Sequence, residues 1–476
     1  MTMVGRIIAG VGTGVLAFTA TAQPLIQELG GGVGVQGVSF LLVDSMNDRL
    51  LLAGSFAYAN DAQVSPGILQ WDAAGFQSLG CGAEWDCVSI VSEAGLANGA
   101  RAIALWNGDI YLGGNFFFTR GGVDYNFIMR WDGTEWYPLG TGMDGPVKSL
   151  RVIDGQLIAA GWFTYADTVL ANGLARWDGE HWHRVHDVPN FYIGGGPNLI
   201  QDVAKFQDQW YIGGNLPLAS DLARWNGSVW EIVGGGFGGP FAQVNKLAVH
   251  DDRLYVAGSF DRCPPYGSPA NPGSGVVAWD GTTWDGLGGG TCGSAAAEVL
   301  SMTWWNDQLH VCGRFDRIGD VQGGKLARWD GNEWCMLTYP NYMGNGNLGA
   351  LTVYHDSLYI GGAFLEAGGY EVSCFGKWIG GEETYACGAL TGVGTLEPTH
   401  GGLTISPNPV SGSFAVQGLS SRSAVLVIRD ILGRDVLRIT TPTDAIDVGY
   451  LSGGTYTVTA FNPTGLPLGT ARFVKE

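Results

Sequence analysis

The side chains that could do chemistry in this sequence do not form a catalytic motif. Its seven histidines contain one close pair, His181 and His183, whose side chains would share one face of a strand. Such a pair could bind a metal weakly, but we interpret it as an exposed strand pair. The sequence has no Gly-x-Ser-x-Gly turn, His-Glu-x-x-His pair, phosphate-binding loop or Asp-rich calcium loop. We therefore predict no catalytic residue, no metal and no cofactor.

Aromatic and acidic side chains instead gather in long, irregular segments at 80–100, 120–126, 186–198, 263–275 and 339–347. Binding sites commonly lie on variable loops that a rigid scaffold holds in place. Aromatic rings beside carboxylates and amides suit a carbohydrate or a peptide, although ordinary solvated loops would have the same composition. The candidate ligand-binding residues are Trp85, Tyr125, Tyr192, Tyr266, Tyr339, Glu84, Asp86 and Asp124.

A repeated unit positions these segments. In each copy a second strand ends in small residues, as at 111–116 and 254–260, and a third strand ends in tryptophan. Four-stranded units repeated every 40–50 residues or so are typical of β-propeller blades. We predict an all-β fold with a seven-bladed β-propeller over residues 23–390. The tryptophans that end the third strands are Trp71, Trp131, Trp177, Trp225, Trp279, Trp329 and Trp378.

Five copies carry Trp-(Asp/Asn)-Gly-x-x-Trp between the third and fourth strands. Glycine adopts the positive φ of a tight hairpin there, and such a turn places the two tryptophans opposite each other. These aromatics could be sugar platforms and the aspartates catalytic acids. Because the same residues recur in copy after copy, we prefer a role in blade packing and turn formation.

The two ends of the repeat region offer rival strands to complete the seventh blade. Residues 26–32 match the fourth strand of the other copies with Ile26 in place of tryptophan, whereas 383–387 would form that strand locally. We prefer residues 26–32, because they would lock the ring.

Eight cysteines are compatible with disulfides in an exported chain, and none forms a Cys-x-x-Cys zinc motif. Cys312 and Cys335 fall on the second and fourth strands of one blade, about 9–10 Å apart. This exceeds the ~7 Å limit for a bridge, so we predict two buried free thiols. The disulfide candidates share a loop, a face or a local hairpin: Cys81 with Cys87, Cys263 with Cys292, and Cys374 with Cys387.

Charge and the N-terminal residues indicate export. The formal net charge of −19 argues against a nucleic-acid partner, because phosphate binding depends on Lys and Arg. Residues 1–22 combine Arg6, an apolar stretch and small residues in the manner of a signal peptide, with predicted cleavage between Ala22 and Gln23. No later stretch reaches the ~18 apolar residues of a transmembrane segment. We expect a secreted or cell-surface protein.

The C-terminal part has a different composition. After a predicted linker at 391–400, residues 401–476 contain no tryptophan and are rich in β-branched residues. Seven short strand candidates in about 75 residues predict a small Ig-like β-sandwich.

Several motifs of this tail, Ser-Pro-Asn-Pro at 406–409 and Asp-Ile-Leu-Gly-Arg at 430–434 among them, occur in the order of the type IX secretion C-terminal sorting domain. The tail resembles that family over nearly its full length. The resemblance implies a Bacteroidetes-type cell, Sec export, and passage through the outer membrane by the type IX secretion machinery. It also implies tail cleavage, followed by release or attachment to surface lipopolysaccharide. The matching residues include Pro407, Asn408, Pro409, Gly433, Gly454, Tyr456 and Lys475.

The repeats at 174–182, 222–230 and 326–334 resemble bacterial propellers related in style to kelch and galactose-oxidase propellers. The copper site of galactose oxidase has no recognisable Tyr/His equivalent here, so the resemblance implies the fold and no oxidase activity. We expect a binding or interaction module for a glycan or an extracellular protein. A carbohydrate-active hydrolase or lyase stays open, because paired carboxylates are close in space and not in sequence. A structural surface protein also stays open.

Overall fold

The computed structural model describes residues 26–29, 32–33, 37–56, 58–59, 62–63, 67–79, 99–191, 196–237, 242–260, 273–291, 297–338, 342, 346–368, 370–380, 386–387, 404–417, 425–429, 435–440, 445–461 and 467–475. The predicted signal peptide and linker lie outside these residues. The chain divides into two compact units, Met1–Leu390 and Thr391–Glu476.

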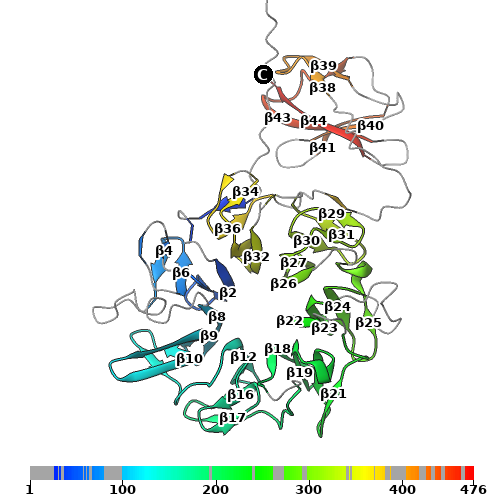
Figure 1. Cartoon of the computed structure of the whole chain (residues 1–476). Helices are drawn as coiled ribbons and strands as arrows, with labels where there is room; N and C mark the ends of the chain where they lie inside the picture. Colours follow the sequence, from blue (N-terminus) through cyan, green and yellow to red (C-terminus); the bar gives the residue numbers. More distant parts are fainter. Residues whose placement is uncertain are drawn as a thin grey trace, which may run out of the picture. The chain divides into compact units, whose positions relative to one another are not determined.

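Seven antiparallel sheets of four or five strands make up most of the first unit (Figure 1). The first four sheets contain β2 (Val38–Asp44), β3 (Arg49–Gly54), β6 (Ile68–Asp72) and β7 (Gly75–Ser78); β8 (Ala100–Trp106), β9 (Asp109–Arg120), β10 (Val123–Trp131) and β11 (Trp136–Pro138); β12 (Val147–Ile153), β13 (Gln156–Gly161), β16 (Leu174–Trp177) and β17 (Trp182–Arg184); and β18 (Leu199–Phe206), β19 (Gln209–Asn215), β20 (Leu222–Trp225) and β21 (Trp230–Ile232).

The other three sheets follow in the same way. They contain β22 (Gln243–His250), β23 (Arg253–Ser259), β24 (Val276–Trp279) and β25 (Trp284–Asp285); β26 (Glu298–Trp305), β27 (Gln308–Arg314), β30 (Leu326–Trp329), β31 (Trp334–Met336) and β37 (Ala386–Cys387); and β32 (Asn347–Tyr354), β33 (Ser357–Ala363), β36 (Phe375–Trp378) and β1 (Ile26–Glu28).

Short elements lie between these strands. Four two-stranded hairpins each follow the second strand of a sheet, and two 3-10 turns occur in the fourth and fifth repeats. They are β4 (Tyr58–Ala59) with β5 (Ala62–Gln63), β14 (Tyr165–Ala166) with β15 (Val169–Leu170), β28 (Arg317–Ile318) with β29 (Val321–Gln322), β34 (Glu366–Ala367) with β35 (Tyr370–Glu371), η1 (Pro217–Ala219) and η2 (Leu287–Gly289).

The first strands of the seven sheets form a closed ring. In Figure 1 they lie nearest the centre, and each contacts the first strand of the next sheet, with β32 contacting β2. The core lies between neighbouring sheets: one buried cluster joins Ala102 and Ile128 of the second sheet to Val147 and Ala159 of the third. Burying both faces of each sheet in this way explains why the second strands are apolar along their length.

The predicted cross-strand aromatic pairs are confirmed. Trp177 stands opposite Trp182 with ring centroids 5.1 Å apart, and the equivalent pairs in four other sheets lie at 4.8–5.8 Å. In the turn between them, Asp178 Oδ1 accepts the backbone N–H groups of Glu180 and His181. The aspartate therefore stabilises the hairpin that sets the register of the pair.

Closure of the seventh sheet by the N-terminal strand is also confirmed. β1 pairs with β36, and Ile26 stands opposite Trp378, in the register that tryptophan pairs occupy elsewhere. Gly376 lets the two strands approach, since a Cβ there would come 2.5 Å from Ile26 Cγ2.

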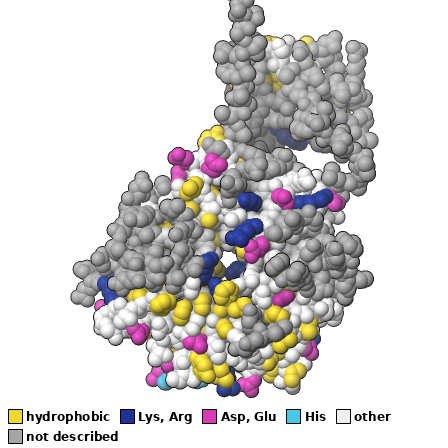
Figure 2. All heavy atoms as spheres, in the orientation of Figure 1, with side chains coloured by type: hydrophobic (Ala, Val, Ile, Leu, Met, Phe, Trp, Pro, Cys, Tyr) yellow, Lys and Arg dark blue, Asp and Glu magenta, His cyan; other side chains and the backbone are white. Residues whose placement is uncertain are grey.

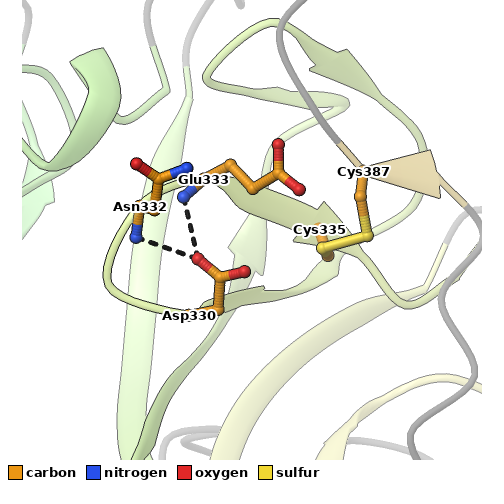
Figure 3. The surroundings of a disulfide bond; sticks show 5 residues. All are labelled: Asp330, Asn332, Glu333, Cys335 and Cys387. Atoms are coloured by element: carbon orange, nitrogen blue, oxygen red, sulfur yellow. Dashed lines mark hydrogen bonds between the residues drawn. A yellow bond between two sulfur atoms is a disulfide. The ribbon is translucent and has the colours of Figure 1, made fainter. Parts of the chain in front are cut away.

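The predicted pairing of Cys374 with Cys387 is wrong, and so is the prediction that Cys335 is free. Because β1 already pairs with β36, the following segment crosses to the sixth sheet, where β37 pairs with β31. This places Cys387 directly opposite Cys335, and the two form a disulfide (Figure 3). Cys374 is a buried free thiol, as is Cys312, whose prediction is confirmed. Cys81, Cys87, Cys263 and Cys292 lie outside the described residues.

The second unit has two antiparallel sheets over one apolar core. A three-stranded sheet contains β38 (Thr404–Ser406), β39 (Ser413–Gln417) and β42 (Ile446–Asp447), and a four-stranded sheet contains β41 (Asp435–Ile439), β40 (Val425–Arg429), β43 (Gly454–Phe461) and β44 (Pro467–Lys475). Phe414 of the first sheet packs on Phe473 of the second, with ring centroids 4.7 Å apart.

Three of the motif residues in the tail have structural contacts. Asn408 Oδ1 accepts the N–H of Val474, Tyr456 stacks on Phe473, and Lys475 lies at the end of β44 and is buried. Gly433 lies outside the described residues. Among the residues that the structure does describe, no helix has the length and apolar character needed to cross a bilayer.

Candidate functional site

Most of the predicted loop residues lie outside the described part of the chain. These are Trp85, Glu84, Asp86, Tyr192, Tyr266 and Tyr339. The prediction of a ligand site at these positions stays a prediction.

Tyr125 does not form part of an open loop, which corrects the prediction for 120–126. β9 and β10 extend as one long hairpin through this segment, and Gly121 and Gly122 form its turn with positive φ. Tyr125 is only 6% exposed, stacks on Phe118 at 4.9 Å between centroids, and donates a hydrogen bond to the Trp136 carbonyl. Its ring is part of the core and is not a ligand platform. Asp124 is exposed and accepts a hydrogen bond from Thr119.

The repeated tryptophans serve packing, as preferred from the sequence. Trp182 donates its indole N–H to the Leu139 carbonyl of the preceding sheet, and Trp284 and Trp334 make the equivalent bond to Gly234 and to a carbonyl of η2. Buried rings held in this way offer no face to a sugar.

Two groupings of possible metal ligands have other partners. His183 Nε2 lies 2.5 Å from Asp178 Oδ2 within its own hairpin. Asp330, Glu333 and Cys335 place one potential ligand atom each within 4.8 Å of one another (Figure 3). The Cys335 sulfur, however, is in the disulfide and offers no thiolate, and Asp330 Oδ1 already accepts two backbone N–H groups of its turn.

A cavity of about 610 Å³ lies where the seven first strands meet, and all seven contribute to its lining. Pockets that bind small molecules have volumes of ~300–1,000 Å³. Figure 2 shows dark blue Lys and Arg side chains gathered around this central opening. They stand out in a chain whose formal net charge is −19.

Each first strand carries a β-bulge at the same place in its register. The residue directly before each bulge residue and the residue two positions after it are buried and apolar, as Val147 and Leu150 are on either side of Lys148. All seven bulge residues are partly exposed and line the cavity, because a bulge turns a side chain out of the alternation of the strand. We call them the bulge ring: Ser39, Arg101, Lys148, Gln201, Asn245, Leu300 and Gly349.

The side chain at the bulge position differs from sheet to sheet, while the residues one before and two after it stay apolar. Ser39 donates a hydrogen bond to the Ala100 carbonyl of the next sheet, and Asn245 donates to the Glu298 carboxylate and the Val299 carbonyl. Of the two variable positions in each strand, the bulge position is the one whose residues line the cavity in all seven sheets. Because the bulges lie near the starts of the first strands, the ring faces the end of the channel where the sheet-to-sheet connections run.

A buried charge network supports the cavity wall. Asp202 is fully buried and accepts hydrogen bonds from Ser149, from the Arg151 guanidinium (2.6 Å to Oδ2) and from the Leu247 N–H. Lys246 Nζ lies 3.9 Å away. Burial alone would raise the pKa of the Asp202 carboxyl, but the Arg151 and Lys246 charges outweigh burial and lower it to about 2. The carboxylate thus stays charged and joins the third, fourth and fifth sheets.

Two cations of the bulge ring have no such partner. Among the described residues no carboxylate pairs with Arg101 or Lys148, and Arg101 Nε is buried without a hydrogen-bond partner. Lys148 Nζ lies 3.7 Å from the centre of the Trp162 ring, which orients the amine by a cation–π contact. Burial, and then the Arg101 charge, lower the pKa of Lys148 to about 8. The two charges are therefore adjacent and mutually repulsive.

Sequence reasoning missed this ring, although a signal was present. The segments 38–41, 100–103, 147–150, 200–203, 244–247, 299–302 and 348–351 all read apolar, variable, variable, apolar. Aligning the repeats on these segments, instead of on their tryptophans, would have isolated two variable positions, of which the first is the bulge position.

Comparison with known proteins agrees with the fold. A family described as a β-propeller domain of unknown function matches residues 154–177. No curated protein matches the sequence significantly. The ring of antiparallel sheets together with this match defines the first unit as a β-propeller.

Several solved structures are similar at low identity. PorZ, an essential surface component of the type IX secretion system of Porphyromonas gingivalis, matches with 12% identity and a TM-score of 0.36, over 90% of this chain and 64% of PorZ. The GH74 enzyme of Niastella koreensis matches with 15% identity and a TM-score of 0.42, over 74% and 55%. A fungal AA5-family alcohol oxidase matches with 12% identity and a TM-score of 0.43, over 94% and 98%. This chain thus spans less than two thirds of PorZ and of the GH74 enzyme.

Proposed function

We propose that this protein is a seven-bladed β-propeller that is exported by the type IX secretion machinery and acts at or beyond the cell surface as a binding module, its ligand held at the bulge ring. The tail, residues 401–476, is its sorting domain, an Ig-like sandwich. Export leaves the propeller to work outside the cell, released or attached to surface lipopolysaccharide.

The bulge ring is the observation that carries the binding role. Seven equivalent positions with seven different side chains line one cavity, and the residues one before and two after each of them are buried and apolar. A cavity of about 610 Å³ has room for a sugar unit or a short segment and not for a folded domain. This favours a glycan, or a segment of an extracellular protein, as the ligand.

The lining of the cavity supports binding better than hydrolysis. Glycosidases use two carboxyl groups flanking the scissile bond, and Glu298 is the one carboxylate among the described lining residues. Its Oε1 accepts a hydrogen bond from Asn245, and its Oε2 lies 3.6 Å from Arg314. Both of its oxygens thus face partners within the cavity wall, and among the described residues the lining holds no second carboxyl group to flank a scissile bond.

A paired binding and turnover assay tests the proposal. Residues 23–476 would be applied to arrays of polysaccharides and extracellular proteins, and the same panel would be assayed for released product. We expect retention of a ligand without turnover, and loss of retention in Gln201→Ala with Asn245→Ala. Turnover that depends on a carboxylate would replace the binding role by an enzymatic one, and no retention on any array would contradict it. Secretion of the chain with and without residues 401–476 checks the sorting role separately.

A further inference from the structure

The cations around the cavity fall into two classes that differ in their partners. Arg151 and Lys246 lie against Asp202, and Arg314 lies 3.6 Å from Glu298. Arg101 and Lys148, which occupy neighbouring positions of the bulge ring on β8 and β12, contact no carboxylate of the described residues. Arg101 and Lys148 are therefore the two lining cations with no carboxylate beside them among the described residues, and they lie on one side of the ring.

Holding two like charges together in a partly buried site opposes folding unless something compensates them. This chain contains 44 Asp and Glu residues against 25 Lys and Arg. A carboxylate at position 39, 201 or 245 of the ring would have neutralised the pair, yet those positions hold Ser, Gln and Asn. The missing negative charge is the one that a ligand would bring.

The next polar member of the ring suits the rest of such a ligand. Gln201 follows Lys148 around the ring, so a side-chain amide continues from the cationic side. The amide of the next member, Asn245, is bound within the wall to Gln243, Glu298 and Val299. Amides donate and accept, as neighbouring hydroxyl groups of a sugar require. Arg101, with its planar fork of donors, fits a carboxylate with two hydrogen bonds.

We propose that the bulge ring binds an acidic sugar, with the carboxylate of a uronate unit between Arg101 and Lys148 and its hydroxyl groups toward Gln201. This assignment rests on the proposed function as a binding module and names its ligand class. A carboxylate on a sugar is favoured over an acidic peptide because the ring beyond Lys148 continues with an amide at Gln201, and the further lining cations Arg151, Lys246 and Arg314 already have a carboxylate beside them.

Matched ligands measure the contributions of the carboxylate charge and of the sugar ring to binding separately. Titration calorimetry would compare tetragalacturonate with its methyl ester, which keeps the rings and hydroxyl groups and loses the charge, and with tetraglutamate as the acidic peptide. We expect tetragalacturonate to bind residues 23–476 and the ester and the peptide to bind at least about tenfold more weakly. Equal binding of the ester, or tighter binding of the peptide, would overturn the inference.

Matched variants place the ligand in the ring. Arg101→Gln and Lys148→Gln should each weaken tetragalacturonate binding about 10- to 100-fold. Arg184→Gln removes a cation of the same kind at the exposed pair with Asp187 and should leave binding unchanged. Lys148→Arg keeps the charge and should retain binding, which guards against an unfolded Lys148→Gln variant.

The outcomes also distinguish this inference from the proposed function. A neutral glycan could bind, with its binding abolished in the Gln201→Ala, Asn245→Ala double variant and unchanged in Arg101→Gln. The role as a binding module would then hold and the acidic ligand would be wrong. If neither class of glycan and no extracellular protein binds, both are wrong.

Discussion

At the scale of single residues, Lys148 makes the charge of the bulge ring depend on pH. Burial and the Arg101 charge lower the pKa of its amine to about 8. Arg101 is the charged group that acts on this amine among the described residues, and Trp162 is its aromatic contact. A ligand carboxylate favours the protonated amine, so we expect tetragalacturonate affinity to fall as the pH is raised from about 7 to about 9.

The dependence should be weaker in Lys148→Arg, because a guanidinium stays charged over this range. Calorimetric titrations at several pH values check this, and a wild-type Kd that does not change with pH would contradict it. The lowered pKa of Lys148 also makes the free energy of unfolding depend on pH. The pKa of this amine is about 8 in the folded chain and 10.5 ordinarily, so its protonation destabilises the folded chain. This destabilisation is absent above about pH 10.5 and complete below about pH 8.

Asp202 is the residue whose loss should cost the most stability in the cavity wall. Asp202→Asn leaves Arg151 and Lys246 without their counter-ion. Because these two side chains are 35% and 21% exposed, we expect a loss of about 2–3 kcal/mol, below that of a fully buried pair. Urea unfolding measures this. Asp187→Asn, which breaks an exposed pair with Arg184, should cost less than about 1 kcal/mol.

The same carboxylate predicts how stability responds to acid. Its pKa is lowered from 3.8 to about 2 in the folded chain, so its contribution is present above pH 3.8 and is lost as the pH falls toward 2. In Asp202→Asn this part of the acid sensitivity should disappear. Identical acid unfolding of the two proteins would show that the network contributes nothing.

At the scale of strands and turns, pairings set by a short turn could be predicted from the sequence. Pairings for which two distant segments compete could not. The Trp-Asp-Gly turn sets its own register, so the pairing of Trp177 with Trp182 follows from the residues between them. Ile26 opposite Trp378 follows from the same pattern. The Cys335–Cys387 disulfide depends on which of two strands pairs with β36. Because β1 takes that place, the local hairpin that would join Cys374 to Cys387 does not form.

The site was harder to predict than the fold for a related reason. Tyr125 was assigned to a loop because a Gly-Gly turn shortens the hairpin signal at 120–126, and only tertiary packing shows its ring stacked on Phe118. The bulge ring was missed because a bulge interrupts the alternation by which strand faces are assigned. The unpaired state of Arg101 depends on residues of other sheets and has no local signature.

The disulfide should stabilise the end of the propeller unit. It closes a loop with a sequence separation of 52, for which removal costs about 2–4 kcal/mol. Cys335→Ser with Cys387→Ser should lower the thermal midpoint of residues 23–476 under oxidising conditions. Wild type treated with a reductant should then resemble this variant. If the reductant lowers the thermal midpoint of the variant by as much as that of wild type, the effect of the reductant does not come from the Cys335–Cys387 disulfide.

At the scale of the whole molecule, the propeller ring depends on its first and last strands meeting. Glu28 and Ser373, which hydrogen-bond across the closure, are 345 residues apart in the chain. Ile26 is 1% exposed in this strand, so Ile26→Ala should cost about 2–5 kcal/mol. Ile232→Ala, in the fourth strand of another sheet where the side chain is 47% exposed, should cost less than about 1 kcal/mol. Urea unfolding compares the two, and equal losses would show that closure contributes no more than any outer strand.

The recurrence of the bulge in all seven first strands has a consequence for how such proteins diversify. A substitution at a bulge position that makes no hydrogen bond to the next sheet, unlike Ser39 and Asn245, alters the cavity wall and leaves the buried apolar residues that stack the sheets unchanged. Mutations there are therefore nearly free of the trade-off between stability and new activity that constrains most binding sites. Each repeat with such a position contributes one independently exchangeable side chain, so duplication of the gene followed by changes at a few of these codons would yield a set of sister proteins with one scaffold and different ligands.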